Sequence, residues 1–308
     1  MLLYKNQFRN KKIFLPCDSS YSEFLKFFIK QQFYLEYKEV RSSCPIFSSG
    51  ISEQHRVSSI GVSSWTLSDD DADICKSKYI RDTIEWADII ITNPPFSLFR
   101  EFMKMVLESG KQFCVLGNMN QILTKDLLPY IVSDKMWFGP SIYSGDRLFE
   151  VPDDYPLNAA GCFIDSNGKR YIRVKGVRWF TNMRPDSPGE SRALQPTVSY
   201  KDMSYERFDY IPDVICINKT SEIPYDYDGL MGVPLTYFDK HNPEIFEIID
   251  GVNRYLVLDK LSLNDEAVKN HRHLLTVNGK IKYFRFLIRK RKHPLNIATY
   301  NWKRVINS

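Results

Sequence analysis

The sequence predicts an α/β protein built on a Rossmann-like, doubly wound sheet, followed by a smaller strand-rich region. Two short apolar runs, at residues 12–16 and 88–92, have the composition of buried strands. Each run is followed by a polar turn and then by an amphipathic helical segment, which is the repeating unit of doubly wound folds. After about residue 136 the pattern changes to short aromatic and β-branched runs separated by turns, which indicates strands.

These patterns divide the chain into two expected regions. Residues 1–135 are expected to form the catalytic, cofactor-binding core. Residues 136–308 are expected to form the strand-rich region, which would recognise the target, and part of it, about residues 210–240, is expected to return to the core. With 308 residues, of which 43% are hydrophobic, the chain is long enough to bury a large core.

The first unit of the core begins with the strand at residues 12–16. A turn follows it, and then a helix is expected over residues 21–29, where Ser20 or Ser22 can cap the first turn. The amides at the start of this helix can hold a polar or anionic group.

A second strand is expected within residues 32–40. An acidic residue at the end of this strand often accepts ribose hydroxyls in nucleotide-binding α/β folds. Glu36 and Glu39 both meet that description, so the candidate ribose ligand is one of these two. The serine- and glycine-rich residues 41–64 indicate an irregular excursion.

The most informative motif is Asn93-Pro94-Pro95-Phe96, directly after the apolar run at residues 88–92. Ligands of open α/β sheets bind outside the carboxyl ends of the strands, so this motif stands where a reacting group can reach it. The two prolines fix φ and restrict the residues before them, which makes the loop stiff. An ordinary strand-terminating turn is the alternative interpretation.

These four residue types suit methylation of an exocyclic amine on an aromatic ring. Such an amine becomes a better nucleophile when its two hydrogens are donated to oxygens that draw the nitrogen toward tetrahedral geometry. The Asn93 side-chain carbonyl and the Pro94 backbone carbonyl can be those acceptors, on a loop stiffened by Pro95. Phe96 offers a flat apolar face for a base removed from its stack. We therefore predict all four as catalytic residues.

Beyond this loop the sequence predicts a helix at residues 98–109, a strand at 112–117 and a helix at 127–132. A hairpin is expected over residues 161–174, with its turn at Ser166-Asn167-Gly168-Lys169. The neighbouring cations are candidates for phosphate contact or simply a solvated face: Arg170, Arg173, Lys175 and Arg178. Residues 280–292 interleave basic and aromatic side chains and suit either DNA contact or a basic terminal element without a partner.

Residues 87–121, ADIIITNPPFSLFREFMKMVLESGKQFCVLGNMNQ, resemble the EcoRI-like adenine-specific DNA methyltransferase family. Further blocks follow in that family's order, at residues 136–139, 147–155, 177–182 and 217–243. The resemblance implies a methyltransferase sheet, S-adenosylmethionine as the cofactor, and transfer of its methyl group to the adenine amine in duplex DNA by base flipping and direct transfer.

The resemblance also assigns cofactor contacts. The turn after the first strand contains no glycine, but it is similar to the family's cysteine-aspartate version, which makes Pro16, Cys17 and Asp18 candidate contacts. Asp73 stands where the family carries a Gly-Asp-Phe element near the cofactor's adenine, although Ala72 and Ile74 replace its neighbours. Asn93 is expected to contact the cofactor as well as the substrate.

One departure from the family concerns the N-terminus. Family members generally carry an N-terminal Asp-Glu-Phe-Tyr-Thr type motif that helps to enclose the methionine end of the cofactor, and no such motif stands before the first strand here. We expect weaker cofactor binding, a second chain that supplies the missing wall, or a truncated copy with little activity.

Composition bears on DNA binding, on metal and disulfide sites, and on the location of the protein. The formal charge of +5 is compatible with DNA binding without requiring it. The six cysteines are scattered and include no Cys-x-x-Cys pair, so neither a metal site nor a disulfide framework is expected. With no signal pattern and no long apolar window, a cytoplasmic protein without membrane contact is expected. The alternatives are an RNA or protein amide methyltransferase with the same loop, or a DNA-binding remnant that has lost catalysis.

Overall fold

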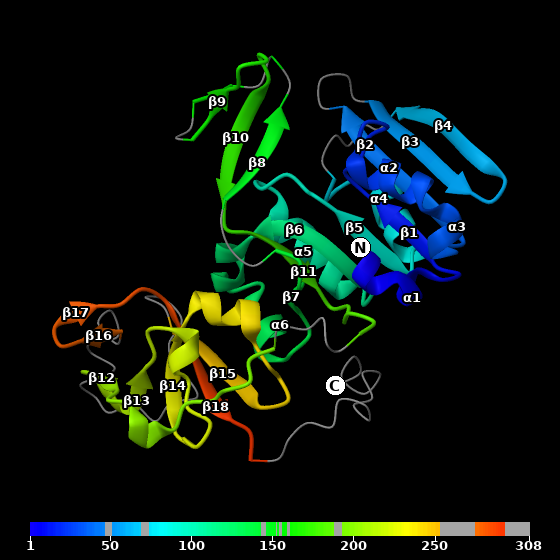
Figure 1. The fold of residues 1–308 in the computed structure, drawn as a ribbon. Helices are drawn as coiled ribbons and strands as arrows, with labels where there is room; N and C mark the ends of the chain where they lie inside the picture. The colour runs from blue at the N-terminus through cyan, green and yellow to red at the C-terminus, as the bar shows by residue number, and fades with distance from the viewer. Residues whose placement is uncertain are drawn as a thin grey trace. The chain divides into compact units, whose positions relative to one another are not determined.

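The structure is a computed structural model, and it describes residues 1–46, 51–68, 74–142, 146–151, 153, 156–158, 161–187, 193–252 and 275–292 (Figure 1). The chain divides into two compact units. The first comprises Met1–Gln121 and Phe138–Pro188, and the second comprises Ile122–Trp137 and Gly189–Ser308. The predicted boundary at residue 135 separates regions by their expected roles and not by their compactness, so it stays a prediction.

The first unit is built on a mixed sheet that has eight strands among the described residues, in the order β4-β3-β2-β1-β5-β6-β11-β7. β2, β1, β5 and β6 run parallel to one another, whereas β3, β4 and β11 are antiparallel to their neighbours. The predicted α/β class is therefore confirmed as a mixed α/β fold with a large mixed sheet. The strands are β1 (Lys12–Leu15), β2 (Glu39–Ile46), β3 (Ile51–Ser58), β4 (Gly61–Ser68), β5 (Ile89–Thr92), β6 (Gln112–Asn118), β7 (Trp137–Phe138) and β11 (Val177–Thr181).

Two helices of this unit, α2 and α4, begin at a serine whose side chain caps the first turn. The Ser22 hydroxyl accepts a hydrogen bond from the Phe24 amide at 3.1 Å, which confirms the predicted capping of α2. The Ser77 hydroxyl caps α4 in the same way. The helical segments are η1 (Leu2–Tyr4), α1 (Lys5–Phe8), α2 (Glu23–Lys30), α3 (Gln32–Leu35), α4 (Lys78–Trp86), α5 (Phe99–Glu108) and η2 (Met119–Leu123).

β5 is buried on both faces, as its apolar run predicts. Ile89 and Ile91 belong to a core cluster that includes Phe8 of α1 and Phe28 of α2. Ile90 alternates to the opposite face of the sheet and is equally inaccessible to solvent. Both faces of β5 are therefore covered, and a polar ligand can reach the strand only at its ends.

Two sequence predictions in this unit differ from the structure. The sequence predicts a strand within residues 32–40, but α3 occupies Gln32–Leu35, and only Glu39 and Val40 of this range belong to β2. Residues 41–64 were expected to be irregular, but β2, β3 and β4 form an antiparallel meander there. The polar side chains are accommodated because they bond to one another, as where the Gln54 amide donates to the Ser43 hydroxyl at 2.9 Å.

A smaller sheet of three described strands follows in the first unit: β8 (Asp146–Val151), β10 (Arg170–Lys175) and β9 (Phe163–Ile164). β9 and β10 confirm the predicted hairpin. Its turn is held by the Asp165 carboxylate, which accepts from the amides of Asn167 and Lys169, both at 2.9 Å. Gly168 has φ +80°, a left-handed conformation that favours glycine.

The second unit contains a sheet with five strands in the described part of the chain, in the order β12-β13-β14-β18-β15, and a small β16-β17 hairpin. The strands are β12 (Glu206–Phe208), β13 (Ile211–Cys216), β14 (Leu230–Pro234), β15 (Phe246–Val252), β16 (Thr276–Val277), β17 (Lys280–Ile281) and β18 (Arg285–Lys290). Its helical segments are α6 (Leu128–Val132), η4 (Tyr200–Asp202), η5 (Thr220–Glu222) and η6 (Leu235–Lys240).

The basic, aromatic segment at residues 280–292 is largely a core strand. Phe286, Leu287 and Ile288 are fully buried, and β18 lies between β14 and β15. The Arg289 guanidinium contacts the Glu247 carboxylate at 2.7 Å. The predicted alternative of DNA contact therefore does not describe the buried strand at the centre of this segment.

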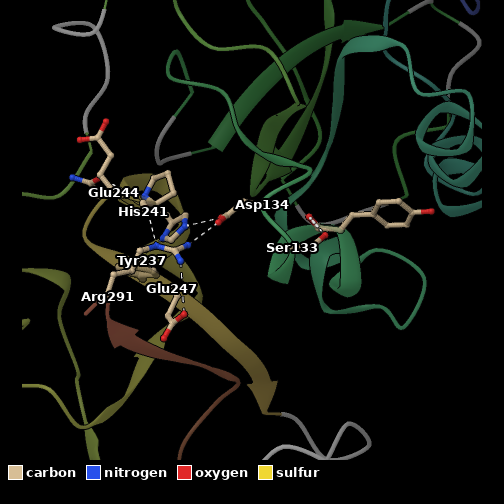
Figure 2. Close-up of polar contacts among 10 residues, drawn as sticks. Ser133, Asp134, Tyr237, His241, Glu244, Glu247 and Arg291 are labelled. Atoms are coloured by element: carbon tan, nitrogen blue, oxygen red, sulfur yellow. Dashed lines mark hydrogen bonds and ion pairs between the residues drawn. The ribbon is translucent and has the colours of Figure 1, made fainter. Parts of the chain in front are cut away.

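Within the second unit, a buried polar cluster joins the residue after α6 to the residues that follow η6 and β18 (Figure 2). The Tyr237 hydroxyl lies 2.8 Å from Nδ1 of His241, and Nε2 of His241 lies 3.2 Å from the Asp134 carboxylate. Arg291 donates to the other oxygen of Asp134 at 3.0 Å. Asp134 has φ +54°, so a residue just past α6 holds a left-handed conformation while its side chain binds both partners.

We expect Asp134→Asn to lower the free energy of unfolding by about 2–3 kcal/mol, because the Arg291 guanidinium loses a charged acceptor in a half-buried position. Asparagine tolerates the left-handed backbone, so the substitution isolates the loss of charge. Denaturant unfolding measures the change. Asp126→Asn, at an exposed position before α6, is the matched control. Equal losses in the two variants would contradict a stabilising role for the cluster.

Candidate active site

The Asn-Pro-Pro-Phe loop, residues 93–96, leaves the carboxyl end of β5 as predicted. Thr92 is fully buried as the last residue of the strand, whereas Asn93 is exposed. The loop runs directly into α5: the Leu98 amide donates to the Pro95 carbonyl at 3.0 Å. Phe96 keeps 45% of its surface exposed, although it lies next to buried core. The loop therefore presents an amide and an aromatic ring to solvent from a rigid base.

The turn after β1, residues 16–18, lies beside this loop. Asp18 is 5% exposed, and one of its carboxylate oxygens accepts a hydrogen bond from the Thr92 hydroxyl at 3.0 Å. Its other oxygen accepts from the Ser22 hydroxyl, at the start of α2. The Asp18 amide donates to the Ser43 carbonyl of β2 at 3.0 Å. Asp18 therefore joins the carboxyl halves of β1, β2 and β5.

The electrostatics of this turn are set by burial. Desolvation raises the pKa of the Asp18 carboxyl from 3.8 to about 6, while the hydrogen bonds from Ser22 and Thr92 act in the opposite direction. Among the described residues, no ion pair to Asp18 offsets the cost of its charge. Desolvation, and then the neighbouring Asp18 charge, raise the pKa of the Cys17 thiol far above its usual value. Cys17 is therefore unsuited to act as a thiolate nucleophile.

The end of β6 reaches the same edge of the sheet. β5 and β6 pair in parallel, with Thr92 opposite Val115. Three residues beyond Val115, the Asn118 side-chain carbonyl accepts from the Asn120 amide at 2.9 Å. The structure thus gathers residues 16–18, residues 93–96 and Asn118 along one edge, which is where α/β sheets bind ligands.

Glu36 and Glu39 are not brought to this edge. Glu36 has φ +50° and follows α3, and its carboxylate pairs with Arg9 at 2.7 Å. Glu39 begins β2, opposite Lys12 at the start of β1, so both glutamates lie on the amino-terminal side of the sheet. The prediction of a ribose ligand depended on a strand that ends at these residues, whereas β2 begins at Glu39. Asp73 lies outside the described residues.

Thr92 is a site residue that the sequence interpretation missed. The sequence pattern identifies Thr92 only as the last residue of the apolar run. In the structure its hydroxyl joins the Asn-Pro-Pro-Phe loop to the turn after β1 by donating to Asp18. The available signal was a hydroxyl residue that ends a β-branched strand immediately before Asn93.

The described part of the chain contains no group of three or more His, Cys, Asp or Glu side chains that could hold a metal ion. None of the six cysteines, all of which are described, forms a disulfide. None of the described helices has the length and apolarity needed to cross a membrane.

Comparisons with known proteins bear directly on this site. The family model described as "Adenine-specific methyltransferase EcoRI" matches residues 62–291, which include the Asn-Pro-Pro-Phe loop. Type II methyltransferase M.MgeORF184P of Mycoplasma genitalium is 34% identical over 297 residues, which cover 94% of this chain and 91% of that protein.

Two further relatives agree. Type II methyltransferase M.EcoRI of Escherichia coli is 33% identical over a 312-residue alignment that covers 94% of this chain and 89% of that protein. Type II methyltransferase M.MpnI of Mycoplasma pneumoniae is 33% identical over 215 residues, 69% of this chain and 67% of that protein. No solved structure matches the chain significantly.

The raised pKa of Asp18 predicts a pH effect on stability. Between the ordinary pKa of 3.8 and the folded value of about 6, the folded chain keeps a proton that the unfolded chain releases. Stability contributed by Asp18 is therefore present at low pH and is lost as the pH rises through this window. We expect Asp18→Asn to remove that loss, on the order of 1–3 kcal/mol.

The measurement is the free energy of unfolding of both proteins from about pH 4 to pH 7, the window in which linkage from Asp18 acts. Asp82→Asn, at an exposed position on α4, serves as the control and should follow the wild type. Parallel pH curves for the wild type and Asp18→Asn would refute the desolvated state of this carboxyl.

We expect Thr92→Val to lower the free energy of unfolding by about 1–3 kcal/mol, because the buried Asp18 carboxylate then lacks one of its two hydroxyl donors. Valine preserves the volume of threonine, so the change tests the hydroxyl alone. Thr92→Ser keeps the hydroxyl and should lose less stability than Thr92→Val. Chemical denaturation at neutral pH ranks the three proteins, and the reverse order would exclude a stabilising hydrogen bond.

Proposed function

The chain belongs to the EcoRI family of adenine-specific methyltransferases, and from this premise we propose that it transfers a methyl group from S-adenosylmethionine to N6 of adenine in duplex DNA. The adenine is flipped out of the helix into the site, and the methyl group passes directly to its amine. The observation that carries this proposal is the position of residues 93–96 at the carboxyl end of β5, linked to the turn after β1 by the Thr92 hydroxyl.

The turn after β1 fits a cofactor that carries positive charge. Asp18 is a buried carboxylate whose charge is offset by hydroxyl donors rather than by an ion pair within the described residues. A cationic group nearby would stabilise its ionised form. The Ser42 hydroxyl, opposite Leu15 at the end of β1, is buried and has no hydrogen-bond partner among the residues that the structure describes. Pro16, Cys17 and Asp18 would therefore hold S-adenosylmethionine, which supplies an activated methyl group.

The residues of the loop prepare the substrate. The Asn93 side-chain carbonyl and the Pro94 backbone carbonyl accept the two hydrogens of the adenine amine and so raise its nucleophilicity. Pro94 and Pro95 hold these acceptors in place, because their φ angles are fixed. Phe96 is exposed enough to receive the flipped base on its ring. Orientation of the two reactants is the main catalytic contribution that this loop offers.

The remaining parts of the proposal concern the fold of the core, the roles of the two regions and the location. The parallel strands β2, β1, β5 and β6 serve as the Rossmann-like, doubly wound half of a methyltransferase core, roughly residues 1–135. Residues 136–308 contribute target recognition, and the predicted role of residues 210–240 at the core is retained as a prediction. A cytoplasmic location suits cysteines that form no disulfide and a DNA substrate. A second chain that completes the cofactor wall has no support in the described residues and is not included.

We expect Asn93→Ala to lower the rate of methyl transfer by about 100- to 1,000-fold. A loss of this size is typical when an enzyme loses one polar group that stabilises the charge of the transition state. The assay is transfer of tritiated methyl from S-adenosylmethionine to unmethylated duplex DNA, with identification of the product base. Cofactor binding, followed by calorimetry, should weaken much less than transfer, because Asn93 is proposed to contact the cofactor but to act mainly on the amine.

Asn6→Ala removes an exposed side chain from α1 and is the control for this assay. Methyladenine formed by the wild type and the control, but not by Asn93→Ala, supports the proposal. Cofactor binding without transfer to DNA would redirect the search to RNA or protein substrates. A chain that binds no cofactor would instead be a remnant without catalysis.

A further inference from the structure

The small sheet of β8, β9 and β10 lacks a core of its own. No described residue of these three strands is buried, in contrast to β5 and β6 of the large sheet. A small sheet normally needs a hydrophobic face packed against another layer. Leu148 is 51% exposed, and Ile164 is 54% exposed. These strands therefore present side chains that the described part of the protein does not cover.

The two faces of the β8–β10 pair, which we call the ribbon, differ in exposure. The antiparallel register places Leu148 opposite Arg173 and Asp146 opposite Lys175, and all four are exposed. Glu150 is also exposed on this face, opposite the half-buried Tyr171. The other face carries only half-buried side chains: Arg147, Phe149, Val151, Arg170, Ile172 and Val174. Within the described residues, one face of the ribbon is therefore open to an external partner.

The exposed face has the chemistry of base recognition. Arg173 and Lys175 can donate to guanine, carboxylates such as Glu150 can accept from cytosine, and an apolar side chain such as Leu148 can contact the thymine methyl. The acidic residues here already pair with cations: Lys169 with Glu150 at 2.9 Å, and Arg173 with Asp146 at 4.0 Å. Such exposed pairs contribute little stability, so they can exchange for base edges at low cost.

The ribbon starts at the same edge of the sheet as the candidate active site. β10 continues into β11 through Gly176, which has φ +69°. The Gly176 carbonyl accepts from the Met119 amide at 2.7 Å, and the Lys175 carbonyl accepts from the Asn118 side chain at 2.9 Å. Both contacts attach the base of the ribbon to the carboxyl end of β6, next to β5 and its loop.

We propose that the ribbon enters the major groove of duplex DNA and that its exposed face reads the base pairs that flank the target adenine. Over Ile172–Lys175 the ribbon has two strands, since β9 pairs with β10 only at Arg170 and Tyr171. A two-stranded antiparallel ribbon fits this groove, which presents a distinct pattern of donors and acceptors for each base pair. The inference rests on the proposed function, since it requires DNA as the substrate. It goes further by assigning sequence specificity to Glu150 and Arg173.

The test compares the wild-type chain with Arg173→Ala and Glu150→Gln on plasmid DNA. Methylated adenines are mapped by sequencing, and methylation rates are measured at the wild-type site and at sites that differ from it by one base pair. We expect each variant to lose about 10- to 100-fold in rate at the wild-type site and to accept other bases at one position. Lys104→Ala, an exposed cation on α5, should keep both rate and specificity.

The outcomes separate this inference from the proposed function. Binding of S-adenosylhomocysteine, together with thermal unfolding, shows that each variant is folded. Unchanged specificity and rate in both variants, with an active wild type, would overturn the ribbon alone. A uniform loss on all sequences with a weaker salt dependence would place these residues on phosphates and would also overturn base reading. A wild type that methylates no DNA would overturn the proposed function, and the ribbon's role with it.

Discussion

The hydrogen bond from the Thr92 hydroxyl to the Asp18 carboxylate organises the first unit around its candidate site. Its two residues are 74 positions apart in the chain, and they meet because β1 and β5 are parallel neighbours. Burying a carboxylate is costly unless its oxygens are bonded, and here two hydroxyls and a backbone contact hold the turn in place. The position of Asn93 depends on this arrangement, since it follows Thr92 directly.

The same edge of the sheet gives the molecule both of its proposed tasks. The Asn-Pro-Pro-Phe loop leaves β5 there, and the ribbon is attached one strand away, at the end of β6. Parallel strands make this possible, because their carboxyl ends all lie on one side. The antiparallel strand β11 then runs back along β6 and contributes Phe180, whose ring packs against Phe99 of α5. The same strand pairings therefore position both the Asn-Pro-Pro-Phe loop and the ribbon.

Polar side chains in buried positions explain where sequence interpretation failed. Residues 41–64 have the composition of a loop, yet β2 and β3 pair there, and Ser43 and Gln54 bond to each other in the interior. In the second unit, the basic segment around Arg289 has the composition of a nucleic-acid contact, yet it forms a central strand whose cations bind Glu247 and Asp134. In both cases the polar side chain bonds to a residue on another strand or segment, so a local sequence pattern cannot predict the contact.

The sequence by itself determined the buried strand at residues 88–92, the exposed loop after it, the capping of α2 by Ser22 and the family. These features are local: apolar runs, proline geometry and helix caps act over a few residues. Only the tertiary structure decided that Asp18 meets Thr92, that Glu36 lies at the opposite edge of the sheet, and that no described layer of the protein buries the exposed face of the ribbon. Strand order and register set those distances, and both depend on pairings between distant segments.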